Sequence, residues 1–459
     1  VDERPLQGDF VQGQAPTPEA HPNASTFMAY HEARSKKASS RGLGLPCVVG
    51  ASSFRFQVTQ NLLTSPDGRV FKAGDILTVD GSHGTVIAGA PEMIEAGLDD
   101  AFQTLLGWAD AIRDIDIRAN ADTPMDARTA RHFAAQGIGL CRTEHMFFDR
   151  DRLKVMREMI FADSAEDRRS ALDLLLPMQR TDFTELFHIM AGKPVCIRLF
   201  DPPLHEFLPS DRAGLRDLAE ALDLPLSDVT RRVQALGEYN PMLGMRGVRL
   251  GITVPEIYEM QAQAIFEATL EASAGGDPVV PEIMIPLVSA RREVELVKTR
   301  IDAVAAAVKN DKGADFAYRL GVMVETPRAA LRANEIATHA SFLSFGTNDL
   351  TQMTYGLSRD DAGRFMSSYV NLGVYPEDPF HMLDIDGVGE LLDIGAKRGR
   401  AVRPNVVLSL CGEHGGSPEA IEFCRKAGFD YVSCSPFRVP VASLAAAQLA
   451  LKDRAKKKT

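Results

Sequence analysis

Two carboxylates follow apolar runs in residues 319–352, and their types and spacing suit a bound metal ion. The apolar run 320–324 ends at Glu325, and the run 342–345 leads into Gly-Thr-Asn-Asp, which ends at Asp349. A strand, helix, strand unit fits this stretch, because strands buried in a parallel sheet appear as continuous apolar runs. Neighbouring strands lie about 5 Å apart. Both carboxylates are therefore expected at one sheet edge, where a shared Mg²⁺ would relieve their repulsion.

A simpler interpretation is that each acid caps the helix or loop that follows it. Asp and Glu are common at such positions, because a helix N-terminus carries partial positive charge. For Glu325 or Asp349 alone, the capping interpretation is the stronger one. The pair together, with polar Thr and Asn beside Asp349, favours a metal site.

Two arginines and a cysteine also stand at the ends of strand-like runs. Arg142 follows GIGLC, Arg198 lies in VCIRLFD, and Cys411 begins CGEHGG. Guanidinium groups bind phosphate or carboxylate through paired hydrogen bonds, and glycines beside the cysteine allow a ligand close to the backbone. Each residue has a structural alternative: Arg142 could pair with Glu144, Arg198 with Asp201, and Cys411 could be an inert buried thiol.

The elements that must position these residues alternate between strand-like and helix-like segments from residue 115 onward. Nine runs resemble strands, and the sequence predicts them at residues 115–121, 137–144, 194–201, 245–251, 282–288, 319–325, 342–348, 406–415 and 430–436. A closed (β/α)₈ barrel of the TIM type needs eight, so one run is misassigned, and 245–251 is the first suspect. A doubly wound open sheet would alternate similarly. Polar residues at nearly every strand end favour the barrel, with a helical insertion at 210–239.

Upstream of the barrel, the pattern changes. Residues 1–25 are polar, contain Pro and Gly, and show no steady period, which predicts an N-terminal arm. Residues 26–90 form a small β/α domain, in which GDILTVDGSHGTVIAG at 74–89 predicts two short strands. Apolar residues at helical spacing predict a linker helix over 91–115. The barrel is assigned to 116–459.

Composition and charge limit the functional classes. The net charge of −11, from 51 Lys plus Arg and 62 Asp plus Glu, argues against general nucleic-acid binding. No apolar run approaches the roughly 18 residues of a membrane span, and the start does not resemble a secretion signal. The six cysteines lack metal-ligand spacing. They are therefore expected to be reduced thiols in a cytoplasmic protein.

Long motifs in this chain resemble those of a known family. Residues 107–451 resemble the phosphoenolpyruvate (PEP)- and pyruvate-binding barrel in the C-terminal half of the pyruvate, phosphate dikinase family, within the PEP-utilising enzymes. The motifs that carry the resemblance are LCRTEHMFF (140–148), RLFDPPLHEFLP (198–209), NPMLGMRGVRLGI (240–252), FGTNDLTQMTYGLSRDD (345–361), CGEHGG (411–416) and YVSCSPFRVP (431–440). They are long and specific, and the resemblance covers three quarters of the chain.

The resemblance implies how charged groups would bind the substrate. Arg142 and Arg198 would grip the phosphoryl group of PEP. Glu325 and Asp349 would hold Mg²⁺ against the phosphate, carboxylate and enolate oxygens. This assignment agrees with the need for a cation where enolate charge develops.

The resemblance also implies which residues line the substrate and move a proton. Gly346, Thr347 and Asn348 would line the substrate, and Cys411 would transfer a proton between the pyruvate methyl group and the enolate, with Glu413 nearby. A thiol near its usual pKa can serve as such an acid. Family members also suggest a homodimer formed through the barrel.

The region before the barrel departs from the family pattern. In the family, a swivelling domain carries a phosphorylated histidine six residues before an Arg-Gly pair. Here that pair begins at Arg41, and six residues earlier stands Ser35. The nearest histidine, His31, is displaced by four residues, about one helical turn, and His83 in the 81–84 turn fits no better. The ATP-binding domain of the family is missing from this sequence.

Three functional interpretations follow from this departure. The first is a Mg²⁺-dependent PEP/pyruvate phosphoryl-transfer enzyme that works with a displaced histidine, such as His31, or with a separate phosphohistidine- or ATP-binding chain. The second is a stand-alone enolate enzyme of the lyase or decarboxylase type, and the third is a non-catalytic PEP sensor. Retention of Cys411 argues against the sensor, because binding alone needs no proton donor.

Overall fold

The computed structural model describes residues 3–6, 53–57, 62–80, 85–91 and 100–456. His31, Ser35, Arg41 and His83 lie outside these residues, so the displaced-histidine hypothesis stays a prediction. Contacts divide the chain into two units, residues 1–104 and 105–459, which we describe separately. None of the described helices combines the length and the apolar character that a membrane crossing requires.

The first unit contains two small antiparallel sheets. One sheet has the order β1-β5-β6, and the other has the order β2-β3-β4. The strands are β1 (Glu3–Leu6), β2 (Arg55–Gln57), β3 (Leu62–Thr64), β4 (Val70–Lys72), β5 (Leu77–Asp80) and β6 (Thr85–Ala88). The two strands predicted in residues 74–89 are confirmed as β5 and β6, while β1 lies within the segment predicted to be an arm. Leu63, Leu77 and Val79 are buried and form the core.

The second unit is built on a closed barrel of parallel strands, so the predicted (β/α)₈ fold is confirmed and the open sheet is excluded. The barrel strands are β7 (Asp116–Asn120), β8 (Ile138–Arg142), β9 (Val195–Arg198), β10 (Glu282–Ile285), β11 (Arg319–Val324), β12 (Phe342–Gly346), β13 (Val407–Cys411) and β14 (Tyr431–Cys434). Strand β14 pairs with β7 and closes the barrel. Eight of the nine predicted runs are these strands.

The ninth run, residues 245–251, was wrongly predicted as a strand. Its second half forms α8 (Val248–Thr253), which follows Gly247 at φ +56°. Val248 and Gly251, three residues apart, are buried on one side of this helix. A Cβ atom on Gly251 would lie 2.2 Å from the ring of Tyr258, so only glycine allows this close packing.

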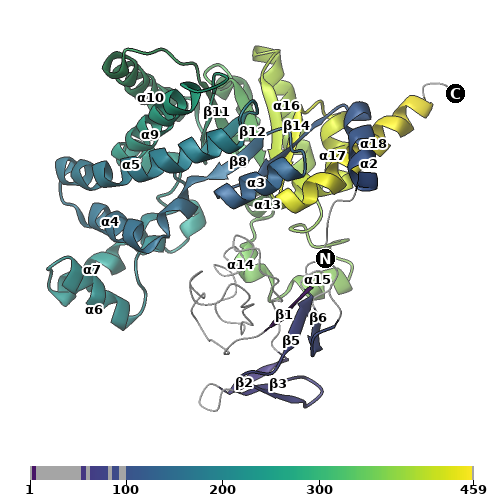
Figure 1. The fold of residues 1–459 in the computed structure, drawn as a ribbon, viewed down its shortest axis with the longest axis horizontal. Helices are drawn as coiled ribbons and strands as arrows, with labels where there is room; N and C mark the ends of the chain where they lie inside the picture. Colours follow the sequence, from purple (N-terminus) through teal and green to yellow (C-terminus); the bar gives the residue numbers. More distant parts are fainter. Residues whose placement is uncertain (1–2, 7–52, 58–61, 81–84, 92–99, 457–459) are drawn as a thin grey trace. The chain divides into compact units, whose positions relative to one another are not determined.

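Helices surround the barrel within the second unit (Figure 1). They are α3 (Pro124–His132), α4 (Arg150–Phe161), α5 (Ala165–Ile189), α9 (Glu256–Ser273), α10 (Arg291–Lys312), α11 (Pro327–Leu331), α12 (Ala333–Ile336), α16 (Val388–Val402), α17 (Pro418–Lys426) and α18 (Val439–Lys456). Helix α2 (Asp100–Ile112) begins in the first unit and ends in the second. Helix α2 lies in the range predicted for a linker helix, of which 92–99 are outside the described residues.

Two insertions extend from this framework. The helical insertion predicted at 210–239 is confirmed as α6 (Arg212–Ala221) and α7 (Leu226–Leu236), which share a small apolar core around Leu218 and Val229. A second insertion follows α13 (Thr347–Tyr355) and contains α14 (Arg359–Ala362) and α15 (Met366–Asn371). Short 3₁₀ helices complete the loops: η3 (Thr143–Phe147), η4 (Leu204–Phe207), η5 (Pro241–Leu243), η6 (Glu413–Gly416) and η7 (Pro436–Arg438).

Candidate active site

The residues predicted to do chemistry lie at the carboxyl ends of the barrel strands, which is where barrel enzymes place their active sites. Arg142, Arg198 and Cys411 are the last residues of β8, β9 and β13. Glu325 directly follows β11, and Gly346 ends β12. Thr347, Asn348 and Asp349 form the first turn of α13. Their common location supports the predicted constellation, while their individual roles stay predictions.

Glu325 and Asp349 follow neighbouring strands, as predicted, because Val324 of β11 pairs with Phe345 of β12. Glu325 is 3% exposed, and its Oε1 accepts a hydrogen bond of 2.7 Å from the Leu287 backbone. Burial, and then the negative charge of Asp349, raise the pKa of Glu325 well above its usual range. An added cation would stabilise the ionised pair.

The helix-capping alternative is wrong for Glu325 and holds only in part for Asp349. Thr326 caps α11 through a hydrogen bond to Ala329, while Glu325 bonds elsewhere. The N-cap of α13 is Gly346, which has no side chain to make a cap bond. The carboxylate of Asp349 accepts a hydrogen bond of 2.9 Å from Arg246. Glu325 therefore does not cap the helix that follows it, while Asp349 lies in the first turn of α13 with its carboxylate bonded to Arg246.

A line of alternating buried charges connects Arg198 with Asp349. Arg198 contacts Glu144 on one side and Asp201, at 3.1 Å, on the other. The same oxygen of Asp201 lies 2.6 Å from Arg246, whose guanidinium also reaches Asp349 at 2.9 Å. The predicted Arg198–Asp201 pair is confirmed, while a role for Arg198 in substrate binding stays a prediction.

Arg142 has a different partner from the one predicted. The pairing with Glu144 is wrong, because the short η3 turn directs Glu144 to Arg198. Asp122 instead accepts 2.7 Å from the Arg142 backbone and lies 3.5 Å from its guanidinium. Burial opposes ionisation of Asp201, but the charges of Arg198, Arg246 and Arg142 lower its pKa. Arg142 is thus near enough to help keep Asp201 ionised.

Sequence reasoning missed Arg246, Glu144 and Asp201 as members of the site. Arg246 was hidden in the run misassigned as a strand. The signal that could have found it is the Arg-Gly step before α8, because Gly247 at positive φ ends the preceding loop. Among the described residues, one buried oxygen each of Glu144 and Asp201, and the buried Nε of Arg198 and Arg246, have no hydrogen-bond partner. Unsatisfied buried polar atoms of this kind indicate where a polar ligand would bind.

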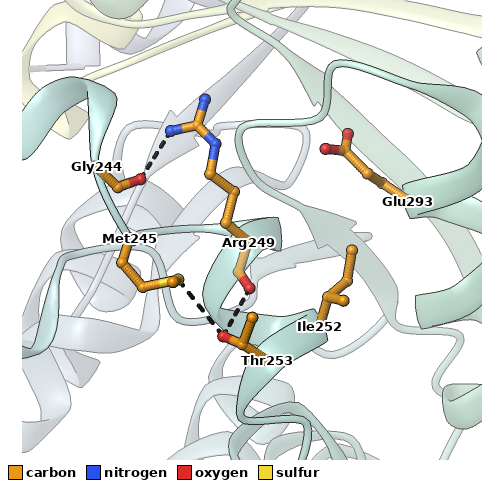
Figure 2. A pocket seen from close by; sticks show the side chains of 6 residues that line it. All are labelled: Gly244, Met245, Arg249, Ile252, Thr253 and Glu293. Carbon is orange, nitrogen blue, oxygen red and sulfur yellow. Dashed lines mark hydrogen bonds between the residues drawn. The ribbon is translucent and has the colours of Figure 1, made fainter.

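The segment that carries Arg246 is braced from the other side by Arg249. Figure 2 shows the guanidinium of Arg249 donating to the Gly244 carbonyl at 2.8 Å, beside an open pocket that is also lined by Met245, Ile252 and Glu293. The hydroxyl of Thr253 donates to the Arg249 carbonyl at 2.9 Å. The bond from Arg249 to Gly244 ties the loop before Arg246 to α8.

Cys411 is 1% exposed and lies beside glycines, as predicted. The Ser344 hydroxyl donates to its sulfur at 3.3 Å, and the thiol lies 3.6 Å from the Phe345 carbonyl. Burial raises the pKa of Cys411, so the thiol is the resting form. Gly412 has φ +119°, and a Cβ atom there would lie 2.7 Å from Thr347 Oγ1.

Thr347 and His414 connect the strand ends to the second insertion. Thr347 donates to the Cys411 carbonyl at 3.3 Å, and Nδ1 of the buried His414 lies 2.9 Å from its hydroxyl oxygen. Nε2 of His414 lies 3.1 Å from the Pro379 carbonyl in the insertion. Glu413 precedes His414 in η6, and its side chain is outside the described part of the structure.

Within the described residues, no cluster of three or more His, Cys, Asp or Glu side chains is arranged to hold a metal. The predicted metal site uses two protein carboxylates, Glu325 and Asp349, with substrate oxygens completing the coordination. Such a two-carboxylate arrangement is common for Mg²⁺, which keeps several other oxygen ligands. The metal assignment stays a prediction at this point.

Comparisons with known proteins agree with the predicted resemblance. A family model described as "PEP-utilising enzyme, PEP-binding domain" matches residues 98–451. A pyruvate, phosphate dikinase from Rhizobium meliloti (strain 1021) is 54% identical over 416 residues, which are 90% of this chain and 46% of the relative. The pyruvate, phosphate dikinase of Clostridium symbiosum is 47% identical over 416 residues, which are 90% of this chain and 48% of the relative.

This chain spans about half the length of these curated relatives. A solved citrate lyase from Burkholderia xenovorans LB400 covers 64% of this chain and 81% of its own at 12% identity and a TM-score of 0.30, values that support no conclusion here. The family model, in contrast, matches most of the chain and includes every barrel strand. The chain therefore belongs to the PEP-utilising enzymes, through their PEP-binding domain.

Proposed function

We propose that this chain carries out the PEP- and pyruvate-handling part of a Mg²⁺-dependent phosphoryl transfer of the pyruvate, phosphate dikinase type. The observation that carries the proposal is the line of buried charges from Glu144 to Asp349, at the same barrel end as the thiol of Cys411. Anion-binding, metal-binding and proton-transfer groups thus converge. The pyruvate, phosphate dikinases that match this chain support the same chemistry.

Glu325 and Asp349 fit a Mg²⁺ ion by their chemistry and their surroundings. Both offer hard oxygen ligands. The pKa of buried Glu325 is raised partly by the charge of Asp349, so a divalent cation would offset the repulsion. When bound, Mg²⁺ supplies positive charge where phosphate and enolate oxygens carry negative charge.

Three arginines would bind the phosphoryl group and carboxylate of PEP. Arg142 and Arg198 are the predicted pair, and Arg246 is added from the structure. The Nε atoms of Arg198 and Arg246 are buried without a partner among the described residues, so each retains a donor for a ligand oxygen. A guanidinium group can present two N–H donors to two oxygens of a phosphate or carboxylate group.

Gly346, Thr347 and Asn348 would line the substrate. A Cβ atom on Gly346 would lie 2.8 Å from Oε2 of Glu325, so the missing side chain leaves that carboxylate unobstructed. Thr347 and Asn348 begin α13, and backbone amides at a helix N-terminus favour anions. Polar lining next to the metal ligands fits a small, highly charged substrate.

Cys411 would move the proton that interconverts enolate and pyruvate. Its thiol proton passes to the methylene carbon of the enolate, which becomes the pyruvate methyl group, and the sulfur retains the electron pair as thiolate. In the reverse direction, the thiolate removes a methyl proton. Burial raises the pKa of Cys411 and keeps the thiol protonated, as the acid role requires. We also retain Glu413 as a neighbour of this step.

The first unit completes the proposal. We assign residues 1–25 to an arm, 26–90 to a swivelling phosphohistidine-like domain, 91–115 to a linker helix and 116–459 to the barrel. The phosphoryl carrier is His31 or a histidine on a separate chain, and the nucleotide site also belongs to a separate chain or a further part of the protein. We place the protein in the cytoplasm as a homodimer.

The test uses PEP labelled with ³²P and purified protein with Mg²⁺. Acid-labile label on the chain that disappears in His31→Ala supports phosphoryl transfer through that residue. Pyruvate release without protein label points to the stand-alone enolate enzyme and contradicts the transfer proposal. Tight Mg²⁺-dependent binding without either signal fits a carrier histidine on a separate chain or a PEP sensor, and exchange of pyruvate methyl protons, which the sensor would not catalyse, distinguishes the two.

A further inference from the structure

The sulfur of Cys411 has a side-chain hydrogen-bond donor inside the barrel. Ser344 Oγ donates to the sulfur at 3.3 Å, and both residues are buried. The sulfur is also 3.6 Å from the Phe345 carbonyl, which can accept the thiol proton. The thiol therefore lies between a donor and an acceptor that together fix its orientation.

The strand register explains why the serine is the nearest side chain on β12. Cys411 pairs directly with Gly346, and Ser344 pairs with Ser409, two residues earlier along β13. Because Gly346 has no side chain, β12 presents no side chain of its own directly opposite Cys411. Diagonal neighbours two residues away remain within reach across a strand pair, and here the diagonal neighbour is Ser344.

We propose that Ser344 is a positioning residue for proton transfer by Cys411. Its hydroxyl fixes the orientation of the sulfur and stabilises the thiolate that remains each time the thiol proton moves to the enolate carbon. In that step the S–H bond breaks, a C–H bond forms, and the sulfur electron pair accepts the serine hydrogen bond more strongly. This inference rests on the proposed function, because it assigns the serine to the proposed proton transfer.

Burial and nearby charges act in opposite directions on the pKa of Cys411, and the Ser344 hydrogen bond is one of the groups that lower it. Burial raises the pKa of the thiol most, and the negative charge of Glu325 also raises it. The Ser344 hydrogen bond and the charges of Arg142 and Arg198 lower it. By comparison, Cys196 is also buried in the barrel, and burial raises its pKa well above the usual value, with the charge of Glu282 adding to the effect.

The first readout does not depend on activity. The S–H stretching band of Cys411 is isolated by subtracting the infrared spectrum of Cys411→Ala from that of the parent protein. In Ser344→Ala, measured against its own Cys411→Ala double variant, the band should shift, because the sulfur loses its donor while the S–H still faces the Phe345 carbonyl. Ser344→Thr keeps the hydroxyl and should retain the parent band.

The second readout is exchange of pyruvate methyl protons with deuterium in the presence of Mg²⁺. Ser344→Ala should lower the maximal exchange rate by about tenfold to a hundredfold, the loss expected for one hydrogen bond to a charged group. The KM for pyruvate should stay the same. Ser409→Ala is the matched control, because it deletes a buried hydroxyl on the neighbouring strand.

Each outcome decides the inference. An unmoved S–H band in Ser344→Ala overturns it, and so does an unchanged exchange rate or an equal rate loss in Ser344→Ala and Ser409→Ala. A shifted S–H band in Ser344→Thr would also contradict the inference, because this variant keeps the hydroxyl. If the parent protein exchanges no methyl protons, the proposed function fails, while the band still decides whether Ser344 bonds the sulfur.

Discussion

Replacing Arg246 by methionine should both destabilise the metal-free protein and weaken PEP binding. The Arg246 side chain is 10% exposed and contacts Asp201 and Asp349, whose side chains are 6% and 14% exposed. Removing one partner of a buried ion pair costs about 3–5 kcal/mol, because it leaves charge buried without compensation. Asp201 keeps Arg198 at 3.1 Å, so we expect the lower end, about 3 kcal/mol.

A double-mutant cycle separates the free energy of the Arg246–Asp349 ion pair from the contribution of side-chain packing. Methionine preserves most of the apolar stem of Arg246, and Asp349→Asn removes the charge of its partner. Urea denaturation without divalent ions, followed by circular dichroism, should give a coupling free energy of about 1–3 kcal/mol. Arg232→Met is the control, because Arg232 pairs with Asp163 at side-chain exposures of 37% and 81%. Such an exposed pair contributes at most about 1 kcal/mol.

Binding gives the functional half of this prediction. With Mg²⁺ present, calorimetry should show that Arg246→Met lowers PEP affinity by about tenfold to a hundredfold, since charged hydrogen bonds contribute about 1.5–3 kcal/mol. Pyruvate lacks the phosphoryl group, so its affinity should change less. The role assigned to Arg246 would be refuted if the stability losses of Arg246→Met and Asp349→Asn simply added in the double variant. It would also be refuted if Arg246→Met lowered the affinities for PEP and pyruvate equally.

Two further predictions concern buried carboxylates. The pKa of Glu325 is raised, by burial and then by Asp349, so its contribution to stability is full below the ordinary pKa and is lost as pH rises through the raised one. Glu325→Gln should therefore stabilise the metal-free protein more at alkaline than at acidic pH; equal gains in urea denaturation at both would contradict this, and Mg²⁺-dependent PEP binding should disappear. Glu282→Gln should have the opposite effect, because Glu282 lies 2.6 Å from buried Arg118. We expect about 3–5 kcal/mol of lost stability in the same assay, and a loss below about 1 kcal/mol would show that the pair is dispensable.

The barrel could be predicted from sequence because its strands are buried on both faces. The run 320–324 is apolar throughout, the run 342–345 is apolar except for Ser344, and polar residues follow both. The same rule failed at 245–251, where Val248 and Leu250 alternate with polar residues as in a strand but are buried in a short helix. Apolar content alone cannot separate the two in so short a segment.

Charge pairing at the site could not be predicted, because it depends on tertiary contacts. Arg246 and Asp349 are 103 residues apart in sequence. Glu144 follows Arg142 closely but pairs with Arg198, because the turn after β8 redirects its side chain. Spacing identified which residues lie at the strand ends, while their partners depend on how the ends of different strands meet.

The most direct test of the account is exchange of pyruvate methyl protons in deuterated buffer, followed by nuclear magnetic resonance. The account predicts exchange that requires Mg²⁺ and disappears in Cys411→Ala, because the buried thiol is the proposed proton carrier. A Cys411→Ala protein that exchanges methyl protons as fast as the parent would contradict the central claim.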